Sequence, residues 1–331
     1  MFLIRPPPFD GESLSSWRQR AGQLNGYWRY PLLDYRSRKI DPDRIFTSRD
    51  LDWLVDQFRY DQGVLKPLTL DVEVARHLAK QRFLNQLRGT LSFSAFGSHV
   101  GGSPMYCPAC LASDPYPFFR VSWRIAFNTR CPVHGCLLRD SCPNCGHRPW
   151  PATHYCAEPR RWISHRYCRA CGYDLGDLEV MPFTEQSSRA QRIQDGLPHE
   201  YGQALWYVSQ LFLRNSTHDM LRRVQAVRGQ PCDALPSNTR RFEHLTIGHR
   251  ESLLDSAEWL IEEWPTRFIQ VAMDCNLNLK SFASTLHLAP SWILLAAVEN
   301  LAKRKRASAP WRIGLAGNGR HTCCTTPDST Q

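Results

Sequence analysis

Four short dyads of cysteine and histidine stand within residues 107–171 and decide how that part of the chain folds. They are Cys107-Pro-Ala-Cys110, Cys131-Pro-Val-His134, Cys142-Pro-Asn-Cys145 and Cys168-Arg-Ala-Cys171. Such a turn places two ligands on one side of a tight knuckle, which supplies two corners of a zinc tetrahedron. Twenty residues separate the first dyad from the second and 22 separate the third from the fourth, which is zinc-ribbon spacing.

We therefore predict two zinc ions per chain, each held by two consecutive dyads. The first ion takes Cys107, Cys110, Cys131 and His134, and the second takes Cys142, Cys145, Cys168 and Cys171. Four protein ligands leave no position for water, so both sites are expected to be structural. A cross-braced arrangement, with the first dyad joined to the third, is the alternative. Substitute ligands could come from the nearby Cys136, Cys156, His147, His154 and His165.

The cysteine count favours metal over disulfides. The 331-residue chain has 13 cysteines, an odd number, and its first residues show no secretory signal. The longest apolar run considered for a membrane span, Trp292 to Val298, has seven residues, well short of the roughly 18 that a span needs. A cytoplasmic location is expected.

The net charge of +10 is unevenly distributed along the chain. Residues 116–170 carry nine Lys or Arg and two Asp or Glu, and residues 300–331 carry six and one. Residues 171–299 between them are acidic. Basic regions of this kind contact phosphate backbones or acidic proteins, although a solvated basic surface is the alternative. The predicted nucleic-acid contacts are Lys303, Arg304, Lys305, Arg306, Arg160 and Arg161.

Helical periodicity flanks the cysteine-rich region on both sides. Ser13 can cap a helix that ends at Asn25-Gly26, Thr47 with Asp50 resembles a capping box, and a third segment starts at Thr69. Helices return near 201–227, 250–263 and 264–306. The prediction is a mainly α fold with small zinc-ribbon insertions. Its expected parts are a helical N-terminal domain (1–100), tandem zinc modules (101–175), a helical C-terminal domain (176–306) and a disordered tail (307–331).

Residues 279–291 have the rhythm of a helix-turn-helix, with Ala283 between the helices and Pro290-Ser291 opening the second. A second helix-turn-helix within residues 1–100 is an alternative to a generic bundle. The second helix of the C-terminal pair, from Trp292 to Val298, offers almost no hydrogen-bonding side chains to base edges. It is better suited to packing or to docking a partner than to reading a DNA sequence.

Signatures of catalysis are weak. The spacing Gly314-x4-Gly319 superficially resembles a phosphate-binding loop, but Arg320-His321 follows where Lys and Ser or Thr belong. Neither G-x-S-x-G nor H-E-x-x-H occurs in the chain. We do not expect an enzyme.

Several of these motifs together resemble the TniQ family of transposon target-selection proteins, which are related to TnsD. The resemblance begins with Arg5-Pro-Pro-Pro8, Glu12-Ser-Leu-Ser-Ser-Trp17 and Asn25-Gly-Tyr27, and continues through the four dyads. It implies helical terminal domains around a zinc-ribbon centre, with no transposase chemistry. It also implies partners: a target, either an attachment site or a CRISPR effector complex, and an AAA+ ATPase that recruits the transposase. Members in RNA-guided systems can act as dimers.

Within this family the favoured hypothesis is an adaptor that links an RNA-guided CRISPR effector at target DNA to the AAA+ ATPase. Longer TnsD-like members carry further DNA-reading domains after the helical region, and this sequence ends soon after residue 306. An attachment-site or conventional target-selection subunit is the alternative within the family. A zinc-containing transcription regulator that reads a defined DNA site is the alternative outside it.

Overall fold

The structure is a computed structural model of the 331-residue chain. It describes residues 3–26, 43, 48–70, 105–125, 128–149, 155–156, 161–178, 199–214, 219–230, 245–282 and 289–302. In the N-terminal half the elements are α1 (Leu14–Leu24), α2 (Ser48–Phe58), α3 (Gln62–Leu65), η1 (Lys66–Leu68), α6 (Pro108–Ser113), η3 (Val121–Arg124), β1 (Tyr155–Cys156) and β2 (Arg161–Trp162). In the C-terminal half they are α8 (His199–Phe212), α9 (Asp219–Val227), α10 (Ile247–Glu262), α11 (Thr266–Asp274), α12 (Leu279–Phe282) and α13 (Ser291–Leu301).

Helix α1 forms as its sequence predicts. Ser13 is its N-cap, and the Ser13 side chain accepts a hydrogen bond from the backbone N–H of Ser16. The helix ends at Asn25, and Gly26 follows with a φ of +74°, a conformation that favours glycine. The fully buried Trp17 packs its ring against Phe58 of α2, with ring centroids 4.5 Å apart. This contact is the centre of the N-terminal hydrophobic cluster.

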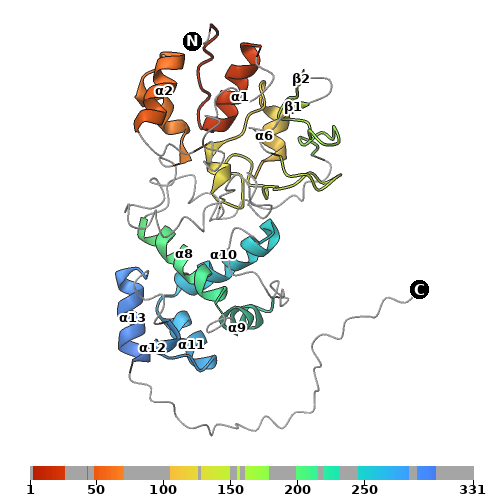
Figure 1. The fold of residues 1–331 in the computed structure, drawn as a ribbon. Coiled ribbons are helices and arrows are strands. Elements are labelled where there is room, and N and C mark those ends of the chain that lie inside the picture. The colour runs from red at the N-terminus through yellow and green to blue at the C-terminus, as the bar shows by residue number, and fades with distance from the viewer. Residues whose placement is uncertain are drawn as a thin grey trace, which may run out of the picture.

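Irregular chain held by short turns dominates the cysteine-rich region. Its regular elements are α6, η3 and the antiparallel pair β1–β2, in which Tyr155 pairs with Trp162. Figure 1 shows this region beside α1, with the two strands at its outer edge. Of the 15 described residues buried in its hydrophobic cluster, six are cysteines, and the others include Met105, Tyr106, Trp123 and Ile247. A cluster of this size, with cysteines taking so large a share, is a small core, and other interactions must help to hold this region together.

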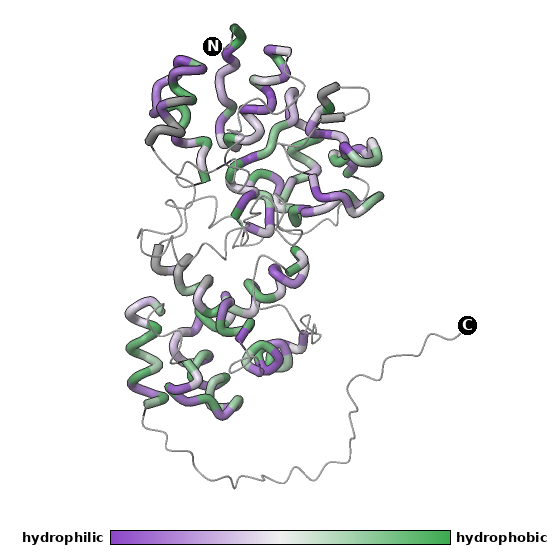
Figure 2. The backbone as a smooth tube through the Cα atoms, in the orientation of Figure 1, coloured by the Kyte–Doolittle hydropathy of each residue, from purple (hydrophilic) through white to green (hydrophobic). Residues whose placement is uncertain are grey.

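The C-terminal helices form a separate group around the largest hydrophobic cluster (Figure 1). Helix α10 crosses α8 and also packs against α9 and α11. It buries Leu253, Leu254, Ala257, Leu260 and Ile261, which recur at helical spacing. Figure 2 shows the hydrophobic residues of α8 and α10 where the two helices meet.

Buried ion pairs join the three groups. Asp43 accepts a hydrogen bond from the backbone N–H of Ser15 at 2.6 Å, and it pairs with the buried guanidinium of Arg124. At the start of α10, the Glu251 carboxylate accepts hydrogen bonds from Thr129 and from Arg130, the latter at 2.5 Å. The helical groups are therefore anchored to the cysteine-rich region by charge pairs that the sequence pattern did not predict.

The mainly helical fold with two cysteine-rich modules is confirmed. The stretch predicted near residues 201–227 is two helices, α8 and α9, rather than one. Pro290 caps α13, which begins at Ser291 as predicted. Thr47, Ala283, the segment 71–104 and the tail 307–331 lie outside the described residues. The domain limits and both helix-turn-helix assignments stay predictions. No helix in the described part of the chain is long and apolar enough to cross a membrane.

Candidate metal centres

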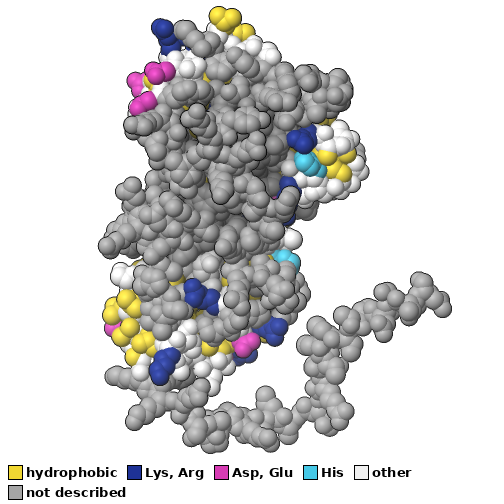
Figure 3. Space-filling view, viewed as in Figure 1, with side chains coloured by type: hydrophobic (Ala, Val, Ile, Leu, Met, Phe, Trp, Pro, Cys, Tyr) yellow, Lys and Arg dark blue, Asp and Glu magenta, His cyan; other side chains and the backbone are white. Residues whose placement is uncertain are grey.

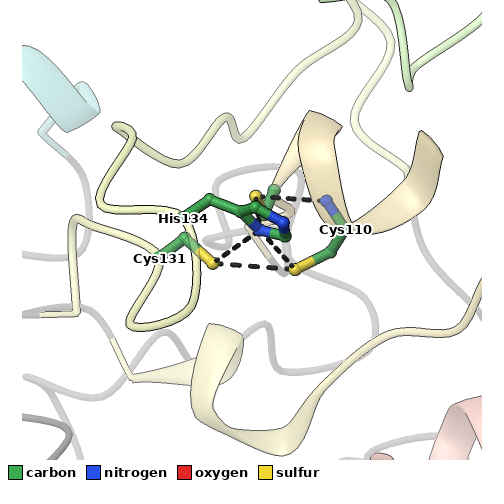
Figure 4. A group of neighbouring side chains, drawn as sticks. Cys110, Cys131 and His134 are labelled. Atoms are coloured by element: carbon green, nitrogen blue, oxygen red, sulfur yellow. Dashed lines mark hydrogen bonds between the residues drawn. The ribbon is translucent and has the colours of Figure 1, made fainter. Parts of the chain in front are cut away.

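The first cluster brings together the first and second dyads. Cys107 is the N-cap of α6, and its Sγ accepts a hydrogen bond from the backbone N–H of Cys110 at 3.4 Å, which turns both thiols to one side. His134 Nδ1 lies 3.6 Å from Cys107 Sγ, 3.3 Å from Cys110 Sγ and 3.7 Å from Cys131 Sγ. Cys110 Sγ and Cys131 Sγ are 3.6 Å apart. Figure 4 shows Cys110, Cys131 and His134 converging on one point.

The second cluster brings together the third and fourth dyads. Cys142 Sγ lies 3.7 Å from Cys171 Sγ, and Cys145 Sγ lies 3.7 Å from Cys168 Sγ. All four ligand atoms fall within 4.8 Å of one another. The structure thus pairs the dyads in sequence order, and the cross-braced alternative does not describe this arrangement.

The knuckles at Cys131, Cys142 and Cys168 share one backbone design. Each ends in a glycine whose N–H donates to the carbonyl of the leading cysteine: Gly135, Gly146 and Gly172, at 2.8, 2.9 and 2.7 Å. These glycines have φ values of +67°, +68° and +76°, which a side chain would strain. A glycine directly after each of these dyads therefore has a direct conformational cause.

The atom separations fit a tetrahedral metal ion. Zinc–sulfur bonds of about 2.3 Å at tetrahedral angles place two sulfurs about 3.7 Å apart. The observed sulfur–sulfur distances of 3.6 and 3.7 Å match that value. Three thiols with one imidazole, and four thiols, are both donor sets of structural zinc sites.

Thiol acidity in the clusters reflects this crowding. Hydrogen bonds from the neighbouring thiols of Cys107 and Cys131, followed by burial, raise the pKa of Cys110. Burial raises the pKa of Cys168 to about 12. The exposed Cys171 differs, because its sulfur accepts a hydrogen bond from the Asn144 side-chain amide and another from the backbone N–H of Tyr173, which lower its pKa to about 6. Packed thiols oppose one another's ionisation, and a coordinated divalent cation reverses that because the thiolate is the ligand.

Among the other ligands considered, Cys136 is the nearest. Its Sγ lies 3.4 Å from Cys107 Sγ, although it is not a member of the four-residue group. His165 is engaged elsewhere, since its two ring nitrogens contact Pro117 and Gln19. Burial lowers the pKa of His147, with Arg169 adding to the effect, and His147 stays outside the second group. His154 lies outside the described residues, and only the backbone of Cys156 is described.

Much of the positive charge of residues 116–170 is used inside the molecule. Arg120 pairs with Asp114, Arg124 with Asp43, Arg130 with Glu251 and Arg166 with Asp174. Arg148 and Arg169, which flank the second cluster, are exposed. Of the predicted nucleic-acid contacts, Arg161 lies in β2 with only its backbone described, and Arg160 and residues 303–306 lie outside the described residues.

Both dyads of the first cluster fall within one family match. Residues 3–138 match the family model TniQ. This chain carries a TniQ region. The match takes in the N-terminal arm, α1 and the first metal cluster, whereas the second cluster and helices α8 to α13 lie beyond it. No curated protein matches the chain. TniQ is a family of transposon target-selection proteins, and the match shows that residues 3–138 are similar to it.

Proposed function

We propose that this TniQ protein is a target-selection adaptor that links a CRISPR effector with its guide RNA, bound at target DNA, to an AAA+ ATPase that recruits the transposase. The family match over residues 3–138 carries this proposal. The metal clusters agree with it, because each provides four protein ligands. Such sites hold a fold together and leave no corner for a reacting water.

We propose that the two ions are zinc and that their role is structural. The first cluster supplies three cysteines and one histidine, and the second supplies four cysteines. Soft thiolate ligands in tetrahedral geometry select zinc over magnesium or calcium. Because six of the 15 described residues in the region's hydrophobic cluster are cysteines, metal binding would add stability to a small core.

The exposed face of α13 supports an adaptor over a sequence reader. Ile293, Ala296, Ala297 and Leu301 pack inward. The opposite face presents Leu295, which is 59% exposed, and Val298, which is 42% exposed. Figure 3 shows hydrophobic side chains gathered at the lower left, where Figure 1 places α13. Aliphatic side chains cannot form the hydrogen bonds that distinguish base edges, but they suit a protein surface.

Contact between basic side chains and nucleic acid is proposed through the phosphate backbone. Two further candidates for phosphate contact are Arg148 and Arg169, which are exposed. They join the six residues proposed from the sequence: Lys303, Arg304, Lys305, Arg306, Arg160 and Arg161. Each phosphate contact that is removed should flatten the salt dependence of binding by about one unit of log–log slope. Replacing Arg148 and Arg169 together by Ala should therefore reduce the slope by about two.

Co-purification tests the adaptor role. Tagged protein would be expressed with the CRISPR effector and the AAA+ ATPase of its own locus, with zinc measured in the same sample. A complex of the three components with about two zincs per chain is expected. The double variant Leu295→Glu, Val298→Glu should weaken this complex. The matched control is Leu178→Glu, which changes an apolar residue that is 50% exposed in another part of the molecule.

Two results would contradict the proposal. One is wild-type protein that binds neither the effector nor the ATPase. The other is isolated protein that binds one DNA sequence at least about a thousandfold more tightly than others, which is the behaviour of an attachment-site or transcriptional reader.

A further inference from the structure

A cavity of about 440 Å³ opens between α1 and the segment that precedes the fourth dyad. Its walls come from three parts of the chain that are far apart in sequence. Phe9, Arg20 and Gln23 belong to the N-terminal arm and α1, Tyr116 follows α6, and Ser164 belongs to the third part. The metal clusters do not contribute a ligand residue to this lining.

The walls are held by buried polar contacts. His165 Nδ1 lies 3.1 Å from the carbonyl oxygen of Pro117, and His165 Nε2 lies 2.7 Å from Gln19 Oε1. The imidazole, itself part of the cavity wall, therefore ties all three segments together. The backbone N–H of Phe119 donates to Ser16 Oγ at 3.1 Å, which further fixes the second wall to α1. A cavity held in this way needs little ordering when a ligand binds.

Flat aromatic surface and polar edges meet in this cavity. The rings of Phe9 and Tyr116 lie within 13° of parallel, with centroids 6.3 Å apart. The Arg20 guanidinium lies 4.0 Å from the centroid of Phe9, held there by a 2.6 Å ion pair with Glu12. Tyr116 is 69% exposed, so much of its side chain is accessible to a ligand.

The chemistry favours a planar ligand with hydrogen bonds at its edge and phosphate attached. Aromatic faces stack on such a plane, while the exposed amide of Gln23 and the hydroxyl of Ser164 can meet its edge. The volume falls in the range of small-ligand pockets of about 300–1,000 Å³, which suits one nucleotide and excludes a duplex. The parallel aromatic rings favour a planar base over a peptide segment, and the exposed Arg148 and Arg169 give this part of the chain positive charge for the attached phosphates.

We propose that this cavity binds one unpaired base of a single-stranded RNA or DNA segment, stacked on Tyr116. The inference draws on the proposed function only in taking nucleic acid as a partner. It adds base contact to the backbone contact proposed above. Stacking accepts every base, so the site distinguishes single strands from duplexes rather than one sequence from another.

Fluorescence anisotropy with the full chain tests this site directly. The probes are a labelled ten-nucleotide RNA, its DNA equivalent, the matching DNA duplex, and a DNA strand of abasic residues that keeps the phosphates without bases. Tyr116→Ala should weaken single-strand binding roughly 5- to 150-fold, the loss expected for one stacked base, and leave duplex binding unchanged. Tyr116→Phe should stay within about twofold of wild type, because the stacking face remains.

Tyr167→Ala is the matched control, since Tyr167 is 42% exposed and is not part of the cavity. Zinc content and melting temperature report whether each variant is folded. The proposal is overturned if the abasic strand binds as tightly as the normal one, or if Tyr116→Ala binds single strands like wild type. It is also overturned if Tyr116→Ala loses only the ATPase or the effector, because the cavity would then be a protein site. Since the titration needs neither partner, its failure is distinct from failure of the adaptor role.

Discussion

The two metal clusters should differ in how far local unfolding spreads through the protein when one ligand is lost. The comparison is between Cys110→Ser in the first cluster and Cys145→Ser in the second. Cys110 is fully buried, whereas Cys145 is exposed. The chemical change is the same in both variants, so any difference in outcome comes from the surroundings.

The expected size follows from the metal and from its neighbours. A structural zinc site contributes about 10–16 kcal/mol in small peptides, and a whole domain is stable by only about 5–15 kcal/mol. Either variant should therefore lose its ion and the local fold. Cys110 shares its hydrophobic cluster with Trp123 and with Ile247, the first residue of α10. Three ligands of the first ion lie in that cluster, and Arg130, next to Cys131, pairs with Glu251 of α10, so loss of the first ion should reach α10. The second ion has two ligands there, Cys142 and Cys168, and Cys145 lies outside the cluster, so its loss should reach α10 less.

Zinc content and amide hydrogen exchange measure both effects. Each variant should retain about one zinc per chain. Cys110→Ser should lose more exchange protection in residues 247–254 than Cys145→Ser does, because local opening there follows the loss of packing. Cys275→Ser, at a half-buried cysteine outside both clusters, is the control. If Cys110→Ser does not yield soluble protein, stepwise chelation of the wild type replaces it, with the exposed second site expected to lose its ion first.

Equal protection of α10 in both variants would refute the proposed coupling. Retention of two ions by Cys110→Ser would refute the ligand assignment itself. Loss of α10 protection in Cys145→Ser would show that the second cluster, rather than the first, supports the C-terminal helices.

Three further variants test single contacts. Asp43→Ala strands the buried guanidinium of Arg124 and should cost about 3–5 kcal/mol in denaturant unfolding; a cost below about 1 kcal/mol would mean that the pair is not formed. Trp17→Ala empties the centre of the N-terminal cluster and should lower the free energy of unfolding by about 3–5 kcal/mol, also measured by denaturant titration. An unchanged unfolding midpoint would argue against the burial of Trp17. Cys136→Ser should keep both ions by elemental analysis, because Cys136 only neighbours Cys107; loss of one ion would make it a ligand.

Local features of the molecule were readable from the sequence. The knuckles form because the two ligands of each dyad are three residues apart and because a following glycine accepts a positive φ. Both effects operate within about five consecutive residues. The cap at Ser13 and the stop at Asn25-Gly26 are equally local. The apolar character of α13 was visible in its composition, and the structure adds which of its residues face outward. Such interactions need no knowledge of the rest of the chain.

The tertiary structure decided what depends on distant partners. Spacing alone allowed a cross-braced pairing of dyads, and only their positions in space selected the consecutive one. The count of basic residues overstated the positive surface, because Arg124 and Arg130 are paired with Asp43 and Glu251, which are 81 and 121 residues away in sequence. The cavity beside Tyr116 needs three separate segments to meet. Contacts across such separations depend on the whole packing arrangement, and no local pattern in a single sequence records them.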